Sequence, residues 1–249
     1  VIISQNKGKR PDGTLHPHSW SILNTKTTIE WILELLKENK ADHNKQTHKY
    51  FVNEKLQKSD YIEDLNQLVD SLQTYHPQPY EFISKNDFES FINVTKNKIT
   101  DSTTVSEFAW ISSEVAAKVG CLHTNTSASS ILNFSSEMFF PLNVKYVDSK
   151  LYLTDTYKPN TELKTHTEIV KINGIDVLEL KNKIANHISS DGYNEKFLDE
   201  IINRNFGYFC TLQLNFPTGY KLEIKEDNIK KEVLLNKNLN NQTSDNSNT

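Results

Sequence analysis

The side chains in this chain that could do acid–base or nucleophilic chemistry are its histidines, cysteines and serines, and His123 comes first among them. A neutral imidazole, whose pKa is about 6.5, can accept a proton from a hydroxyl and return it to a leaving amine. His123 follows the predicted end of a helix at Gly120, and a helix C-terminus favours the protonated ring, which works against its role as a base. The alternative is a structural histidine whose ring caps or packs against that helix end. From the residues alone, both roles are open.

A nucleophilic serine is not recognisable in the sequence. Such a serine needs an exposed strand-to-helix turn with small neighbours and nearby oxyanion donors. None of the seven glycines begins a Gly-x-Ser sequence. The serines at 127, 129 and 130 follow His123 in a predicted polar loop. We therefore expect no serine-dependent hydrolysis by this chain alone.

Neither a metal site nor any other cofactor is predicted. The two cysteines, Cys121 and Cys210, are too few for a four-ligand metal site or a disulfide framework, and we expect two buried free thiols. His16 and His18 stand two positions apart without a third ligand, which indicates a solvated arm. No glycine-rich loop precedes a predicted helix, so no phosphate-binding loop is expected.

Three helices that would position His123 are predicted before it, each with its own start or stop signal. The first begins near residue 59 or 60 and ends before Pro77. The second is capped by Ser84. The third begins at a capping box formed by Thr104 and Glu107 and ends at Gly120. Apolar residues at helical spacing indicate that each helix buries one face.

After Gly120 the apolar pattern changes to a period of two, which predicts strands joined by tight turns. Asn173-Gly174 is the strongest turn signal in the chain. The expected elements are strands at 143–147, 151–153 and 168–172, helices at 177–188 and 195–202, and a hairpin of strands at 208–216 and 220–224.

Four short sequences, taken in order, resemble the tail-specific and tricorn-like serine peptidases. Residues 75–80, Tyr-His-Pro-Gln-Pro-Tyr, look like the His-Pro-x-x-Tyr step of that family. Residues 120–124, Gly-Cys-Leu-His-Thr, are similar to its Gly-Asp-x-His-Thr step, with Cys121 where the family usually has Asp. Residues 140–142 and 168–174 look like its PDZ-like segment. The resemblance extends over residues 60–216.

The resemblance implies an α+β fold, with an N-terminal helical unit followed by a small PDZ-like mixed β/α module. In the tricorn-like branch, the histidine of the His-Thr step is the general base for a serine later in the chain. That role falls here on His123, and the catalytic core with its serine is expected beyond this chain. Such enzymes commonly work outside the cytoplasm, so a periplasmic or secreted parent protein is expected.

The PDZ-like module further implies a groove for an extended peptide. The groove is expected between a strand near residues 139–142 and the helix at 177–188, although an ordinary strand–turn–helix without a ligand is the alternative. The partner would be a peptide or an unfolded protein substrate. The expected substrate-binding residues are Phe140, Pro141, Leu142, Val177, Leu180 and Ile184.

The expected organisation of the chain has four parts. Residues 1–57 form a polar arm, an amphipathic helix and a linker, residues 58–136 the helical unit, residues 137–232 the PDZ-like module with its following helix and hairpin, and residues 233–249 a disordered tail or linker. His16-Pro17-His18 and Trp31-Ile32-Leu33 also resemble the last histidine and closing helix of α/β-hydrolase-type esterases. That resemblance would make residues 1–40 the end of a preceding domain.

Composition excludes several classes of function. Lys and Arg number 28 against 32 Asp and Glu, a net charge of -4, which argues against a nucleic-acid-binding protein. No apolar run reaches the roughly 18 residues of a membrane-spanning helix. The sequence therefore predicts the N-terminal, non-catalytic portion of a serine peptidase that engages unfolded peptides. The alternative is a self-contained peptide-binding or scaffold protein, and the oligomeric state is not predicted.

Overall fold

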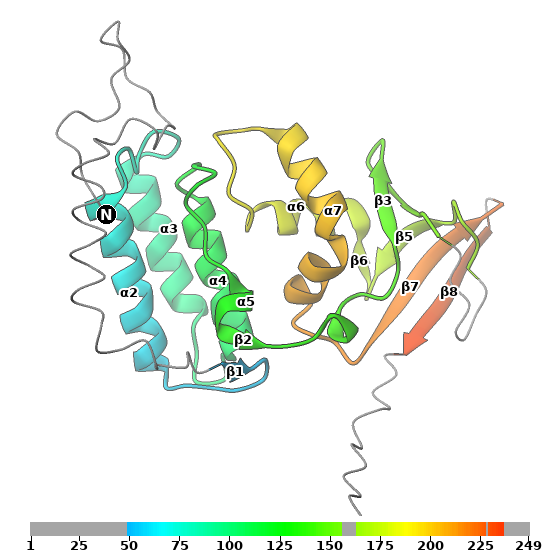
Figure 1. The fold of residues 1–249 in the computed structure, drawn as a ribbon, viewed down its shortest axis with the longest axis horizontal. Coiled ribbons are helices and arrows are strands. Elements are labelled where there is room, and N and C mark those ends of the chain that lie inside the picture. Colours follow the sequence, from blue (N-terminus) through cyan, green and yellow to red (C-terminus); the bar gives the residue numbers. More distant parts are fainter. Residues whose placement is uncertain (1–48, 156–162, 228, 237–249) are drawn as a thin grey trace, which may run out of the picture. The chain divides into compact units, whose positions relative to one another are not determined.

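The computed structural model describes residues 49–155, 163–227 and 229–236. These residues belong to the second of the two units into which the chain divides, Lys49–Thr249. The predicted N-terminal part, residues 1–57, lies outside the described residues, except for residues 49–57 of its linker. Within the described ranges the predicted α+β class is confirmed, with helices first and a sheet after them (Figure 1).

The helical part contains α2 (Lys58–Tyr75), α3 (Lys85–Lys98) and α4 (Val105–Ala117). The predicted caps are confirmed, since the Ser84 side chain accepts the N–H of Asp87 and Thr104 and Glu107 form a capping box. After α4 follow the short helix α5 (Ala128–Ile131) and a 3-10 turn (Ser136–Met138). Strand β1 (Tyr50–Phe51) pairs in parallel with β2 (Leu132–Asn133), which closes the end of this part.

The core of the helical part consists of side chains at the predicted helical spacing. Tyr61 packs its ring against Phe108, with 4.7 Å between the ring centroids. The hydroxyl of Tyr61 accepts the N–H of Leu56, and burial raises the pKa of this phenol. Other buried members are Leu65, Phe88, Ile92, Ile99, Val115 and Val119.

The second part is an antiparallel sheet with strand order β3-β4-β5-β7-β8, in which β6 pairs with β5. At the Asn173-Gly174 turn both residues have positive φ, as a tight hairpin turn requires. The strands are β3 (Val144–Val147), β4 (Lys150–Leu153), β5 (Glu168–Ile172), β6 (Ile175–Asp176), β7 (Gly219–Glu226) and β8 (Ile229–Asn236).

Helices α6 (Val177–Ala185) and α7 (Glu195–Gln213) cover one face of this sheet (Figure 1). Leu222 and Ile224 of β7 are buried with residues of both helices in one core. Their neighbours in β7 point the other way and form ion pairs, Lys221 with Glu232 at 2.7 Å and Glu223 with Lys230 at 2.6 Å. The sheet therefore has one buried face and one charged, solvated face.

The prediction that the segment 208–216 is a strand is wrong. Most of it is the end of α7. Ile202, Phe206 and Cys210 are all buried and recur every fourth residue, so a helical period governs burial here. The apolar alternation near residue 208 comes from side chains that pack toward both the helical core and the sheet core.

Two boundaries and one predicted strand also differ from the prediction. The hairpin pairs β7 with β8, and β8 continues to Asn236, past the predicted start of the tail at 233. Helix α6 ends at Ala185 instead of 188. Residues 139–142 are not a strand in the structure, because the main-chain N–H of Phe140 bonds to α7, to the side chain of Thr211 and the carbonyl of Gly207.

Candidate functional site

His123 lies on a tight turn that follows the end of α4. Gly120 has φ +70°, a left-handed conformation that glycine adopts without strain, and it follows α4, whose last helical residue is Ala117 and not Gly120 as predicted. The N–H of Thr124 then donates to the carbonyl of Cys121 at 2.9 Å, which closes the turn. Cys121 and His123 therefore stand on the same short turn.

A second segment, the loop 186–194 between α6 and α7, is hydrogen-bonded along this turn. The N–H of Gly192 donates to the carbonyl of Gly120 at 2.9 Å. The N–H of Leu122 donates to Oδ1 of Asp191 at 3.0 Å, and the hydroxyl of Ser189 donates to the carbonyl of Thr124. Because these bonds join segments far apart in sequence, they fix the loop and the turn relative to each other.

Phe82, from the loop between α2 and α3, packs against both segments. A Cβ added at Gly120 would lie 2.8 Å from Cδ2 of Phe82, and one added at Gly192 would lie 2.8 Å from its Cε1. Tyr193 meets the ring of Phe82 edge-on at 6.2 Å, and its hydroxyl donates to the Phe82 carbonyl at 3.2 Å. Glycine at both positions thus allows this close approach, by which Phe82 packs against both segments.

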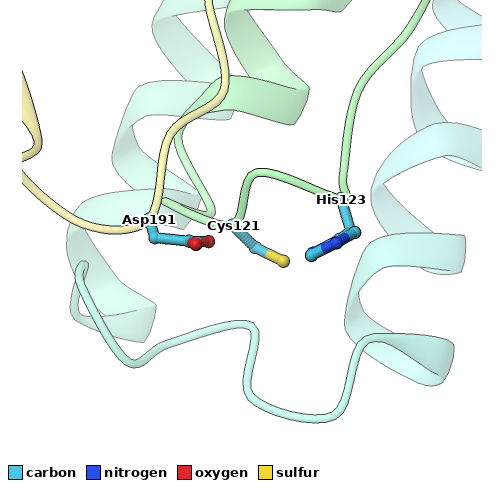
Figure 2. Close-up of side chains that lie close together, drawn as sticks. All are labelled: Cys121, His123 and Asp191. Carbon is cyan, nitrogen blue, oxygen red and sulfur yellow. The ribbon is translucent and has the colours of Figure 1, made fainter. Parts of the chain in front are cut away.

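These contacts bring Cys121, His123 and Asp191 together. The thiol sulfur, a ring nitrogen and a carboxylate oxygen all lie within 4.8 Å of one another. Figure 2 shows the side chain of Cys121 between the carboxylate of Asp191 and the ring of His123. Cys121 is half-buried, and the other two side chains are exposed. The cluster thus offers an accessible imidazole with a carboxylate and a thiol beside it.

The predicted site residues are not all brought to one place. His123 is in the cluster described above. Of the six predicted peptide-groove residues, five are buried in the core of the sheet part, and Leu180 and Ile184 have no exposed surface. Pro141 alone is exposed. A peptide groove between these segments would therefore need the core side chains to become accessible.

The cysteines and His76 also have defined environments. Neither cysteine forms a disulfide, as expected, but only Cys210 is buried, whereas Cys121 is half-buried. Nδ1 of His76, in the His-Pro-x-x-Tyr step, accepts the N–H of Gln78 at 3.2 Å, and burial lowers the pKa of this ring. That bond gives His76 a structural role in the turn after α2.

Asp191 is the site residue that the sequence did not predict. It lies in a loop of ordinary composition, Ser189-Ser190-Asp191-Gly192, without the spacing of a known motif. The Asp-Gly pair indicates a turn and nothing about His123. Only the contacts between the two loops bring this carboxylate to the histidine.

Comparisons with known proteins give a limited likeness. No protein-family model and no curated protein matches the chain. Among solved structures, a mutant of CPAF, a chlamydial serine protease, matches with a TM-score of 0.48 and 16% identity, over 72% of this chain and 34% of that chain. Mature CPAF with lactacystin and a further structure of mature CPAF match over the same shares with TM-scores of 0.47, at 16% and 14% identity.

The chain therefore spans 34% of the length of these neighbours. At this identity and TM-score the likeness assigns no residue role. Within the described ranges, no helix is long and apolar enough to cross a membrane.

Proposed function

We propose that this chain is the N-terminal part of a tail-specific or tricorn-like serine peptidase, in which His123 is the general base for a serine outside residues 1–249. The observation that supports this most directly is the cluster of His123 with Asp191 and Cys121. A general base needs a fixed backbone, a ring that the hydroxyl can reach, and surroundings that favour the imidazolium. The hydrogen-bonded turn at residues 120–124, the exposed ring of His123 and the carboxylate of Asp191 meet these needs.

Asp191 takes the place of the carboxylate that the resemblance leads one to expect at Cys121. Opposite unit charges at 4 Å attract by about 1 kcal/mol in water and about 4 kcal/mol at an effective dielectric constant of 20. Because the carboxylate and the ring are both exposed, the smaller figure applies. A gain of about 1 kcal/mol in the transition state corresponds to a rate effect of roughly fivefold. Asp191 is therefore a positioning residue of modest effect.

In this proposal the substrate is an unfolded peptide, and the two parts of the chain shape its path to the active site. The parent enzyme would work outside the cytoplasm, as the resemblance implies. The chain alone would hydrolyse no peptide, since it has no recognisable nucleophile.

The test uses the parent protein with its downstream sequence and compares two histidines. His123→Asn should lower kcat/KM for an unfolded protein substrate by about 100-fold or more, the usual effect of removing a general base. Asp191→Asn should lower it by less than about tenfold. The matched control is His166→Asn, because His166 is an exposed histidine in the sheet part. It should leave the rate unchanged.

Two results would overturn the proposal. One is an active parent enzyme whose kcat/KM is the same with Asn at position 123. The other is serine-dependent cleavage by residues 1–249 alone. If the parent protein has no catalytic core after Thr249, the peptide-binding or scaffold function predicted as the alternative takes its place.

A further inference from the structure

We infer that Cys121, His123 and Asp191 form a binding site for Zn²⁺, with three protein ligands and one open coordination position. These residues supply a thiolate, an imidazole and a carboxylate, the donor types that zinc takes in proteins. Three protein ligands with an open fourth position are typical of sites where the metal meets water or a substrate. A thiolate among the ligands favours zinc over Mg²⁺ and Ca²⁺, which prefer oxygen ligands alone.

The geometry needs only a small closure around the ion. The donor atoms lie within 4.8 Å of one another, whereas the ligand atoms of a tetrahedral zinc ion are roughly 3.5 Å apart. Cys121 and His123 stand two residues apart on one turn, and their side chains point toward each other (Figure 2). Because His123 is exposed, its side chain has room to turn toward Cys121 and toward the Asp191 carboxylate, which the Leu122 N–H holds.

The backbone around the ligands is already held in place. One carboxylate oxygen of Asp191 accepts the N–H of Leu122, which orients the carboxylate and leaves its other oxygen for a metal. Hydrogen bonds of this kind, from the protein to a metal ligand, raise metal affinity in known sites. The Gly192–Gly120 bond and the packing of Phe82 hold the two loops together. Little chain entropy is therefore lost when the ion binds.

Zinc bound at this site would also prevent His123 from acting as a general base. The ring nitrogen that faces Cys121 would donate its lone pair to the metal and could not accept a hydroxyl proton there. This consequence rests on the proposed function, whereas binding itself does not. The metal would thus be an inhibitor of the assembled peptidase, and removal of the metal would release the base.

The experiment measures metal binding on residues 1–249, without any peptidase assay. Zn²⁺ binding is followed by calorimetry and by competition with Co²⁺, whose bond to a thiolate gives an intense near-ultraviolet absorption. We expect one Co²⁺ per chain with this absorption, displaced by Zn²⁺ and unaffected by excess Mg²⁺. The absorption separates this site from the histidines of the N-terminal arm, since those histidines supply no thiolate.

The variants are Cys121→Ser, His123→Asn and Asp191→Asn, with Cys210→Ala and His166→Asn as controls. In known sites, removal of a group that hydrogen-bonds to a metal-ligating side chain lowers metal affinity by about 10–100-fold. Removal of a ligating side chain itself should therefore lower zinc affinity by about 100-fold or more. Asp191→Asn keeps an oxygen to accept the Leu122 N–H, so its loss of affinity cannot come from a broken loop. The Co²⁺–thiolate absorption should vanish in Cys121→Ser and persist in Cys210→Ala.

Zinc affinity that is unchanged in all three ligand variants, or the absence of a thiolate band with Co²⁺, would overturn the metal site. If binding is confirmed but His123→Asn leaves the parent enzyme active, the proposed function fails and the metal site stands. If the general base is confirmed while zinc does not bind, the metal site fails and the proposed function stands. The two ideas are therefore tested separately.

Discussion

Replacement of Gly120 by alanine tests whether the approach of Phe82 holds the His123 turn. The new Cβ would lie 2.8 Å from Cδ2 and 3.0 Å from Cβ of Phe82. Rotation of the phenyl ring moves Cδ2 away, but Cβ is attached to the backbone and moves only with it. The clash at Gly120 therefore requires one of the two loops to shift. At Gly192 the contacts are with Cε1 and Cζ, at the far end of the ring, which can turn aside.

The cost of Gly120→Ala has two parts. An alanine at φ +70° costs about 1–2 kcal/mol relative to glycine, and overpacking adds about 1–3 kcal/mol. The expected loss in free energy of unfolding is therefore about 2–5 kcal/mol. Gly174 is the matched control, because it has φ +82° and no atom within 4 Å of an added Cβ. Gly174→Ala should cost only about 1–2 kcal/mol, with Gly192→Ala between the two.

The assay is urea unfolding of residues 1–249, followed by far-ultraviolet circular dichroism. For a chain of this size each kcal/mol lowers the melting temperature by about 2–4 °C, so thermal melts should give the same order. The double variant Gly120→Ala/Phe82→Gly, which also removes the Cβ at position 82, should be less destabilised than the sum of its single variants by about 1–3 kcal/mol. Equal losses for Gly120→Ala and Gly174→Ala, or additive effects in the double variant, would refute the argument that Phe82 locks the turn.

Three further predictions concern polar groups that are buried or half-buried. Thr211→Val should cost about 1–3 kcal/mol in unfolding free energy, because it removes the buried hydroxyl that accepts the Phe140 N–H and bonds the Tyr220 hydroxyl, and the loss of such buried hydrogen bonds costs about 1–3 kcal/mol. Thr95→Val should raise stability by about 1 kcal/mol, since the buried Thr95 hydroxyl has no hydrogen-bond partner among the described residues; equal effects of the two substitutions in urea unfolding would contradict this account. Burial lowers the pKa of His187, so the unfolded chain binds more protons and stability should fall as the pH drops from about 6.5 toward the lower folded-state pKa. His187→Gln should flatten that fall in unfolding free energy between pH 7.5 and 5.5, and an unchanged slope would show that this ring binds protons equally in the folded and unfolded states.

Local sequence rules were sufficient for most of the helical part. The capping residues Ser84 and Thr104, with Glu107, form the predicted bonds. Each such cap involves residues within a few positions of each other, so the sequence pattern contains all the partners. The Asn173-Gly174 turn was predictable for the same reason, because two adjacent residues determine its φ angles.

The end of α7 was not predictable by these rules. Residues 208–210 are apolar, and apolar and polar side chains alternate from there to Phe216, so this short segment has the period of a strand although it is mostly helix. Phe209 contacts both cores, and Leu212 belongs to the core of the helical part although α7 also covers the sheet. Contacts on two sides remove the polar stripe that would have indicated a helix.

The candidate site shows most clearly what a linear pattern leaves out. The sequence places Cys121 and His123 two positions apart, so any pairing of thiol and imidazole is already local. Asp191 reaches them only because the Leu122 N–H and the Gly192–Gly120 bond fix the α6–α7 loop against the turn. Its carboxylate then stands beside the residue that occupies the usual position of an aspartate in the resembling family. The combination of a thiol with that displaced carboxylate favours a metal site, because an aspartate at position 121 would supply no sulfur ligand. From the sequence, Cys121 is only a departure from a peptidase motif. In the proposed site it is the residue whose sulfur lets His123 share a zinc ion.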